Sequence, residues 1–300
     1  MKTITCKTCG IKTEDNSINQ CKKFCSDRCR HAFRRNSSLK GGEKKTAKPF
    51  SEVVGELLAQ TNKKNISVLP PIAQSKVKFT GKGDEETAVV VLSDWQLGHK
   101  TISFDKDVAR KRVQYLMEKV LRIVNLHRQA SDINEIVLFL EGDVIQSDKV
   151  GFLVDQSELE DIIIDQVYQD AVPLLVWLIK ECAKNFKKVS VYCVRGNHGR
   201  GEKGTSDKNN WDDVIYKTLE IKFSEYPNVQ FHIAREFYQA VKIYKWTFLL
   251  THGDQVRGGS YGIPLYALLQ RMLRWATSMP FHWDVLLVGH WHCYGHIEQN

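Results

Sequence analysis

Side chains able to bind metal ions follow five apolar runs of the sequence, each at the point where the run ends. The clusters contain Asp94, Gln96 and His99; Gly142 and Asp143; Gly196, Asn197 and His198; His252; and Gly289, His290 and His292. Carboxylate, amide and imidazole groups are costly to bury unless they are paired or bound to a metal. Glycine lets the backbone turn sharply enough to aim such groups at one point. Five clusters in succession therefore predict a shared metal site.

The elements that must position these clusters are strands alternating with amphipathic helices. The predicted strands are residues 87–93, 135–140, 189–194, 229–234, 246–251 and 284–289, and the predicted helices are residues 104–128, 158–183 with an interruption at Pro173, 210–224 and 264–277. This alternation indicates an α/β domain. Ligands of such domains bind beyond the carboxyl ends of the strands, which is where the five clusters lie.

The ordered series Asp94-x-Gln96, Gly142-Asp143, Gly196-Asn197-His198, His252 and Gly289-His290-x-His292 resembles the motif set of the calcineurin-like metallophosphoesterases. The resemblance spans residues 87–292 and implies a four-layer α-β-β-α sandwich, here assigned to residues 87–300. It also implies two metal ions. The first would be held by Asp94, Gln96, Asp143 and His292, and the second by Asp143, Asn197, His252 and His290.

The chemistry of these ligand types agrees with the resemblance. Two divalent ions that share a carboxylate can clamp the attacking and leaving oxygens of an in-line displacement, and imidazole with carboxylate suits Mn, Zn or Fe. A water between the ions would be acidified to hydroxide and attack phosphorus. The resemblance makes Asp143 and His198 the catalytic residues, with His198 stabilising developing charge or protonating the leaving oxygen. The other interpretation of His198 is a hydrogen bond that supports a ligand.

Three departures from the family pattern carry expectations of their own. Gln96 replaces the usual histidine; its neutral amide is a weaker ligand, which favours Mn²⁺ or Mg²⁺. His99 either compensates for Gln96 or faces solvent or substrate. Gly199 stands where a carboxylate commonly follows His198, so the acid role of His198 is weakened. The chain stops eight residues after His292, so either further C-terminal strands are missing or the C-terminal edge of the domain is unusual, and we expect reduced stability.

Residues for binding the substrate are expected in the loops around the same clusters. Arg200 follows the third cluster, Arg257 follows the fourth, and His99 belongs to the first. A guanidinium group can bind a phosphate through two parallel hydrogen bonds. The alternative is that Arg200 and Arg257 simply belong to mobile polar loops.

The N-terminal residues 1–35 form a predicted zinc finger. Cys6-x-x-Cys9 and Cys25-x-x-x-Cys29 are two close thiol pairs, an arrangement that brings four thiolates to one structural Zn²⁺. Residues 24–35 resemble the second half of small treble-clef or ribbon-like zinc fingers. Cys21 is an alternative ligand to Cys25. Disulfide bonds are the competing interpretation, which a chain without a secretory signal disfavours.

Positive charge is concentrated near the N-terminus of this 300-residue chain, whose formal net charge is +8. Residues 1–48 hold 13 Lys and Arg against four Asp and Glu, whereas the remainder holds 30 basic and 31 acidic residues. The basic segment is either a solvated charged face or a contact for nucleic-acid phosphates. Residues 36–86 are predicted to be a linker with a short helix at 49–60.

Two cellular locations are disfavoured by the pattern of apolar residues. No run of about 18 uncharged apolar residues occurs, and the N-terminus lacks the apolar stretch of a signal peptide. We therefore expect a cytoplasmic protein with no membrane partner.

Three functions remain compatible with the sequence, because the resembling family does not fix the substrate. The leading hypothesis is a phosphodiesterase or nuclease that the basic finger targets to nucleic acid. The first alternative is a phosphomonoesterase that acts on protein or nucleotide. The second is a binding or scaffold protein in which Gln96 has weakened the first metal site.

Overall fold

The computed structural model describes residues 2–6, 12–15, 69–72, 83–148, 158–201, 209–257 and 262–298. The chain divides into two compact units, Met1–Gly55 and Glu56–Asn300. In the first unit, β1 (Lys2–Thr5) pairs with β2 (Lys12–Asp15) in antiparallel orientation, and the Cys6 side chain that follows β1 is buried. The other predicted zinc ligands, Cys9, Cys25 and Cys29, and the predicted helix at 49–60 lie outside the described residues.

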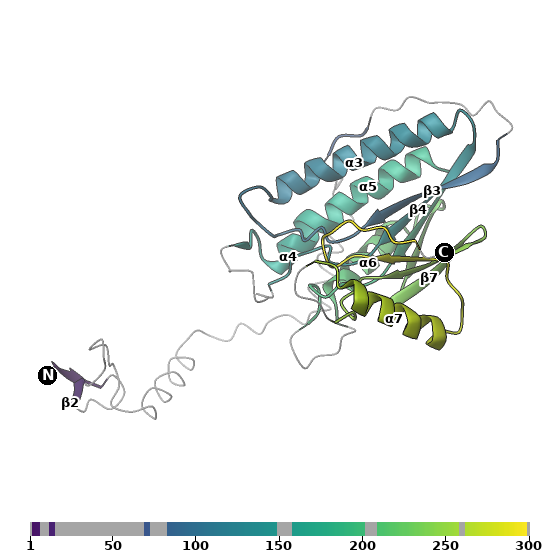
Figure 1. The fold of residues 1–300 in the computed structure, drawn as a ribbon. Helices are drawn as coiled ribbons and strands as arrows, with labels where there is room; N and C mark the ends of the chain where they lie inside the picture. Colours follow the sequence, from purple (N-terminus) through teal and green to yellow (C-terminus); the bar gives the residue numbers. More distant parts are fainter. Residues whose placement is uncertain are drawn as a thin grey trace. The chain divides into compact units, whose positions relative to one another are not determined.

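The second unit contains a parallel four-stranded sheet (Figure 1). Its strands, in spatial order, are β3 (Glu85–Leu92), β4 (Asp132–Leu140), β5 (Lys188–Cys193) and β6 (Val229–Ile233). Leu92 pairs with Leu140, and Leu140 pairs with Cys193. The carboxyl ends of β3, β4 and β5 are therefore level, so the first three polar clusters begin at the same edge of the sheet.

A second sheet contributes the other two clusters. It consists of β7 (Tyr238–Ile243), β8 (Trp246–Thr251) and β9 (Val285–Val288), with β7 antiparallel and β9 parallel to β8. Thr251 pairs with Val288, so His252 and Gly289 leave this sheet side by side. The apolar pattern of the sequence does not predict β7, which forms a hairpin with β8 across a turn in which Tyr244 has a φ of 52°.

Four helices cover the outer faces of the two sheets. They are α3 (Lys106–His127), α5 (Val172–Asn185), α6 (Trp211–Lys222) and α7 (Leu265–Ser278). The first three pack on the parallel sheet, and α7 packs on the second sheet (Figure 1). No helix in the described part of the chain is long and apolar enough to cross a lipid bilayer.

Side-chain alternation along the strands explains the layering. On β4, Ile136 and Leu138 join the core beneath α3, α5 and α6, whereas Val137 and Phe139 join the core between the sheets. Residues that alternate in this way point to opposite faces of a strand, and here both faces are apolar. The expected four-layer α-β-β-α sandwich is thus confirmed for the second unit.

The predicted helix 158–183 is a composite of three segments. It begins with α4 (Ile163–Asp165), continues as the π-helix η2 (Gln166–Ala171) and ends as α5. The expected interruption at Pro173 is a change from π-helix to α-helix, and Pro173 lies in the first turn of α5. Proline cannot donate a main-chain hydrogen bond, which fits a change of hydrogen-bonding pattern at this point of the composite helix. Single π-helical turns often occur near functional sites.

Residues 69–72, within the predicted linker, lie against α5. The indole Nε1 of Trp177 donates to the carbonyl oxygen of Pro70 at 3.0 Å, and the Ile72 N–H donates to Glu181 Oε2 at 3.2 Å. Leu69 and Ile72 also pack on the core that α5 shares with the parallel sheet. These four residues are therefore attached to the second unit.

A buried ion pair joins η2 to α3. Arg110 Nη2 lies 2.5 Å from Asp170 Oδ1, and the Asp170 side chain is only 2% exposed. Burial raises the pKa of Asp170 to about 6, although the charges of Arg110 and Lys106 oppose this shift. The folded state therefore holds this proton more tightly than the unfolded chain does. Protonated Asp170 therefore contributes to the free energy of unfolding below the pKa that Asp170 has in the unfolded chain. This contribution is lost as the pH rises through about 6.

Replacing Asp170 with asparagine should remove this pH dependence. We expect the free energy of unfolding of Asp170→Asn, minus that of the wild type, to increase by roughly 2 kcal/mol as the pH is raised from 4 to 7. Urea unfolding at several pH values measures the difference. Asp107→Asn, which removes the exposed partner of the same Arg110, controls for loss of an ion pair. A relative stability that is constant with pH would contradict the role given to Asp170.

Candidate metal centre

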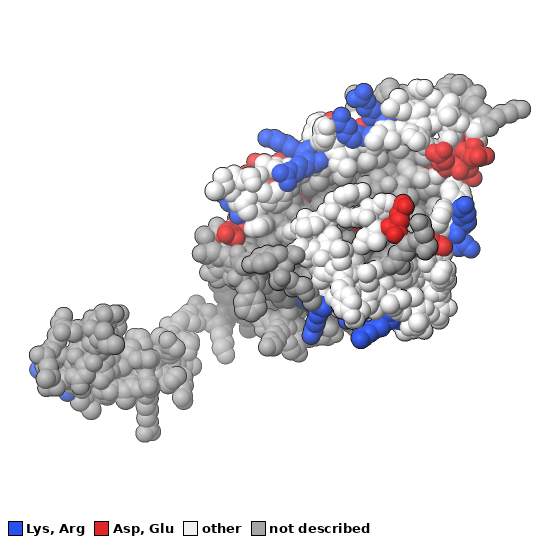
Figure 2. Space-filling view, in the orientation of Figure 1, with Lys and Arg blue, Asp and Glu red and all other residues white. Residues whose placement is uncertain are grey.

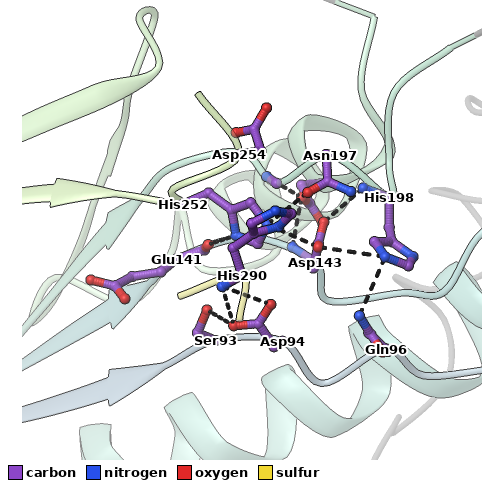
Figure 3. Close-up of polar contacts among 12 residues, drawn as sticks. Ser93, Asp94, Gln96, Glu141, Asp143, Asn197, His198, His252, Asp254 and His290 are labelled. Carbon is purple, nitrogen blue, oxygen red and sulfur yellow. Dashed lines mark hydrogen bonds and ion pairs between the residues drawn. The ribbon is translucent and has the colours of Figure 1, made fainter. Parts of the chain in front are cut away.

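Loops from both sheets meet at a group of acidic and imidazole side chains (Figure 3). Asp143 follows β4, His252 follows β8 and His290 lies just beyond β9. Their ligand atoms all lie within 4.8 Å of one another. Five loops that are far apart in sequence thus contribute to one site, as the polar clusters at the strand ends predict.

Asp143 and His252 form the centre of this group. Asp143 Oδ1 accepts a hydrogen bond from the His198 N–H at 2.7 Å. When His252 is neutral, Asp143 Oδ2 accepts no hydrogen bond from the described residues, although His252 Nε2 lies 2.9 Å away. His252 Nδ1 lies 2.8 Å from the carbonyl oxygen of Glu141, so Nδ1 carries the proton. In the neutral imidazole, Nε2 then directs a lone pair towards Asp143.

Three lone pairs converge at this point. Asn197 Oδ1 lies 3.1 Å from the same His252 Nε2 that faces Asp143 Oδ2. Oxygen and nitrogen lone pairs repel one another unless a proton or a cation lies between them. The neutral imidazole, the amide oxygen and the carboxylate are also good ligands for Mn, Fe or Zn. The donor set therefore fits a divalent metal ion.

A proton can take the place of a metal ion at His252. Burial lowers the pKa of His252, but its hydrogen bond with Asp143 and the charges of Asp143 and Asp94 raise it to about 9. Burial likewise opposes ionisation of Asp143, yet contacts with His252 and His198 hold the pKa of this carboxyl below its usual value. A metal ion that binds here must displace the proton of His252.

The remaining predicted ligands lie on the other side of Asp143. His292 Nε2 is 3.5 Å from Asp94 Oδ1. The Gln96 amide lies between two imidazoles, with its Nε2 3.0 Å from His292 Nε2 and 3.3 Å from His198 Nε2. The Gln96 side chain thus lies beside His292 and His198, and its role as a metal ligand stays a prediction.

Asp94 connects the two sheets as well as facing the site. Its Oδ1 and Oδ2 accept the His290 N–H at 3.1 and 2.9 Å, and its Oδ2 accepts the Ser93 hydroxyl at 2.5 Å. Burial raises the pKa of Asp94, but contacts with His292 and Ser93 lower it to a value below the usual one. A Cβ atom on Gly289 would lie 2.0 Å from Ser93 Oγ. Only glycine fits where the two loops cross.

Five of the predicted ligands have backbone conformations that L-residues rarely adopt. Their φ angles are 55° for Asp94, 45° for Gln96, 51° for Asp143, 75° for His290 and 51° for His292. Such conformations cost on the order of 1 kcal/mol each and persist when surrounding contacts fix them. Two such contacts are the Asp94 N–H to Gly142 O bond at 3.2 Å and the Gln96 N–H to Asp143 O bond at 2.9 Å.

Buried polar side chains behind the ligands were missed by the sequence analysis. Gln166 of η2 accepts the Ser147 N–H at 2.8 Å and donates to the Asp161 carbonyl oxygen at 2.7 Å. A Cβ on Gly98 would lie 2.3 Å from Gln166 Cδ. Gln166 thus holds the loops after β3 and β4, but in the sequence it is one polar residue in an amphipathic helix.

Glu141 is a second group that the sequence analysis did not single out. It is 1% exposed, and its Oε1 has no hydrogen-bond partner in the described structure. Burial raises the pKa of Glu141 to about 8, opposed by the positive charge of His252. Its side chain points away from the other site residues (Figure 3). Its main-chain oxygen, not its carboxyl group, serves the site by binding His252.

The three predicted substrate residues differ in their surroundings. Arg200 forms an ion pair with Asp254, which joins the loops after β5 and β8. His99 Nε2 lies 3.7 Å from Glu158 Oε2, and its ring is 6.5 Å from that of Phe104. Arg257 is exposed. The loop after β8 thus holds one of these arginines in an ion pair and presents the other to solvent.

Comparison with known proteins defines the class. Residues 87–294 match the model of the calcineurin-like phosphoesterases, and the chain belongs to this family. The family uses a dimetal centre for metal-dependent hydrolysis of phosphoesters.

Individual proteins add little to this assignment. No curated protein sequence matches the chain. Among solved structures, a protein of unknown function from Aquifex aeolicus is similar at 13% identity and a TM-score of 0.28, over 70% of this chain and 81% of the other.

The proton on His252 predicts that metal binding depends on pH. Because His252 must lose this proton before Nε2 can bind an ion, Mn²⁺ affinity should fall by up to about tenfold per pH unit below pH 9. Calorimetry in buffers of different ionisation enthalpy should show release of at least one proton per protein molecule at pH 7.5 as the centre fills. His252→Asn should reduce that number by about one. An affinity that does not change with pH would be incompatible with this assignment.

Proposed function

We propose that the protein hydrolyses phosphodiesters in a nuclease-like reaction that requires two divalent metal ions, and that its basic N-terminal segment brings it to nucleic acid. The observation that carries the hydrolytic part is the convergence of Asp143, His252 and His290 within 4.8 Å. It is supported by membership of a family of metal-dependent phosphoesterases. Metal ions at such a centre activate water and neutralise charge on the phosphate.

The chain's own residues would divide the work as follows. Asp94, Gln96, Asp143 and His292 would hold one ion, and Asp143, Asn197, His252 and His290 the other. Asp143 suits the shared position because its Oδ2 is buried without a hydrogen-bond partner while Oδ1 is fixed by the His198 N–H.

His198 is placed to contact the phosphate. Its Nδ1 lies 3.1 Å from the carbonyl oxygen of Gln146, so Nδ1 donates and Nε2 is directed towards Gln96 and Asp143. When protonated, Nε2 can donate to a phosphate oxygen or to the leaving oxygen. In the neutral form it can only accept a hydrogen bond.

The surroundings of Arg200 favour a diester over a monoester. A phosphate monoester carries up to two negative charges and needs more positive groups than a diester does. Arg200 is already paired with Asp254 beside the site, which leaves less of its charge for a substrate. A singly charged diester requires less compensation, so this pairing supports the proposed substrate class.

Nucleic acid is proposed as the target because positive charge is concentrated in residues 1–48. The 13 basic residues against four acidic ones in residues 1–48 would release counterions on binding a polyanion. On the face of the second unit drawn in Figure 2, Lys and Arg lie along α3 and in smaller groups at the right and lower edges, with a broad uncharged surface between them. The N-terminal segment is therefore the stronger candidate for the phosphate contact.

The substrate class can be tested with small esters and DNA. In Mn²⁺, we expect turnover of bis-p-nitrophenyl phosphate at least tenfold above that of p-nitrophenyl phosphate, together with cleavage of single- or double-stranded DNA. Asp143→Asn should lower these rates at least a thousandfold, because it removes the shared ligand. Asp107→Asn, an exposed aspartate on α3, should leave them unchanged. Faster monoester turnover would support a phosphomonoesterase, and no turnover of any ester would support a binding protein.

The role of the N-terminal segment has its own test in the full-length chain. Replacing Arg30, Arg34 and Arg35 with glutamate should weaken DNA binding and reduce the slope of log affinity against log salt by up to about 3. The matched control replaces Lys111, Lys119 and Arg122 of α3 with glutamate. Turnover of the small diester should be unchanged by either set. Equal losses of DNA affinity in the two variants would refute targeting by this segment.

A further inference from the structure

Asp212, at the start of α6, is a fully buried carboxylate that touches two of the ligand-bearing loops. Its Oδ2 accepts the Gly196 N–H at 2.8 Å and the Asp143 N–H at 3.1 Å, and its Oδ1 accepts the Val144 N–H at 3.2 Å. None of its side chain is exposed to solvent. One side chain therefore binds three main-chain donors from the ends of β4 and β5.

These donors lie at the points where the ligand loops bend. Asp143 has a φ of 51°, and a Cβ atom on Gly196 would lie 2.1 Å from Asp143 Oδ1. The two loops therefore approach each other closely. In the described structure the N–H groups of Asp143, Val144 and Gly196 bind the Asp212 carboxylate and no main-chain oxygen. A carboxylate offers two acceptor oxygens to such donors, whereas a neutral carboxamide offers one acceptor oxygen and an NH₂ group that can only donate.

Asn210 completes the connection. Its side-chain Oδ1 accepts the Asp212 N–H at 2.8 Å, and its Nδ2 donates to the Gly196 carbonyl oxygen at 2.8 Å. A Cβ atom on Gly199 would lie 2.2 Å from Asn210 Oδ1, so glycine at position 199 is what admits Asn210. The Trp211 N–H also donates to the Gly199 carbonyl oxygen at 2.8 Å. The start of α6 is thereby fixed against the loop that carries Asn197 and His198.

We propose that Asp212, supported by Asn210, is a positioning residue that sets the geometry of the metal centre by holding Asp143 and Asn197 in register. Both of its oxygens are occupied by main-chain donors, so it contacts neither metal nor substrate. It acts through the backbone of the shared ligand and of the loop that bears Asn197. Outer groups that orient ligands typically change metal affinity 10- to 100-fold when they are removed.

The proposal rests on the metal centre of the family and not on the identity of the ester. Binding of Mn²⁺ in the absence of substrate therefore tests the role of Asp212. If the protein binds Mn²⁺ but cleaves no ester, the proposed function is wrong and the role of Asp212 is unaffected. Asp212→Asn replaces one acceptor oxygen by an NH₂ group that opposes the backbone donors. In the full-length protein we expect Mn²⁺ affinity, measured by calorimetry on folded protein, to fall at least tenfold.

A matched control separates positioning from general stability. Asp170→Asn also converts a buried carboxylate to an amide, but Asp170 contacts Arg110 and no ligand loop. It should change the melting temperature while leaving Mn²⁺ affinity within about threefold of the wild type. If both variants lose stability and both keep wild-type Mn²⁺ affinity, Asp212 is only a structural residue and the proposal is wrong.

A second variant keeps the test decisive if Asp212→Asn does not fold. Asn210→Ser retains an oxygen able to cap α6 but loses the donor to the Gly196 carbonyl. We expect a three- to tenfold loss of Mn²⁺ affinity, and Asp212→Glu should bind Mn²⁺ more tightly than Asp212→Asn wherever both fold. Unchanged affinity in Asn210→Ser would overturn the proposal.

Discussion

Burying the negative charge of Asp143 between two sheets costs free energy that only its neighbours can offset. One oxygen receives the His198 N–H, and the other faces the imidazole of His252. Both contacts require close approach of the loops after β4, β5 and β8. The glycine at 196 permits that approach, since any larger residue would collide with the carboxylate. The arrangement of strand ends is therefore set by the needs of one charged group.

Other polar contacts of the site residues hold the two sheets together. Asp94, after β3, binds the backbone of His290 beyond β9, and the Glu141 carbonyl oxygen, after β4, binds His252 beyond β8. Between the sheets the apolar core is small, with Val137, Phe139, Val194, Val241 and Leu250 as its buried members. At this end of the sandwich, the site residues supply much of the cohesion. Ligand geometry and packing of the sheets are therefore coupled.

Most of the architecture and the site could be predicted from the sequence because both depend on local patterns. Apolar runs mark the buried strands, and polar residues directly after them mark the strand ends. β7 escaped prediction because Tyr238–Ile243 is half-exposed, includes Gln239 and Lys242, and leads into no polar cluster. Asp212 and Gln166 escaped because their partners are main-chain groups from distant loops. In the sequence, Asp212 resembles an ordinary acidic residue in the first turn of a helix.

The positive φ angles at five predicted ligand positions have a consequence for how the protein balances stability against activity. Each position combines an unfavourable backbone conformation with a side chain crowded by others that carry lone pairs or charge. Glycine would adopt the same conformations without strain. Folding alone would thus favour small, neutral residues at these points. The chain instead carries Asp, Gln and His there, so the side chains that can bind metal ions are placed at a cost in thermodynamic stability.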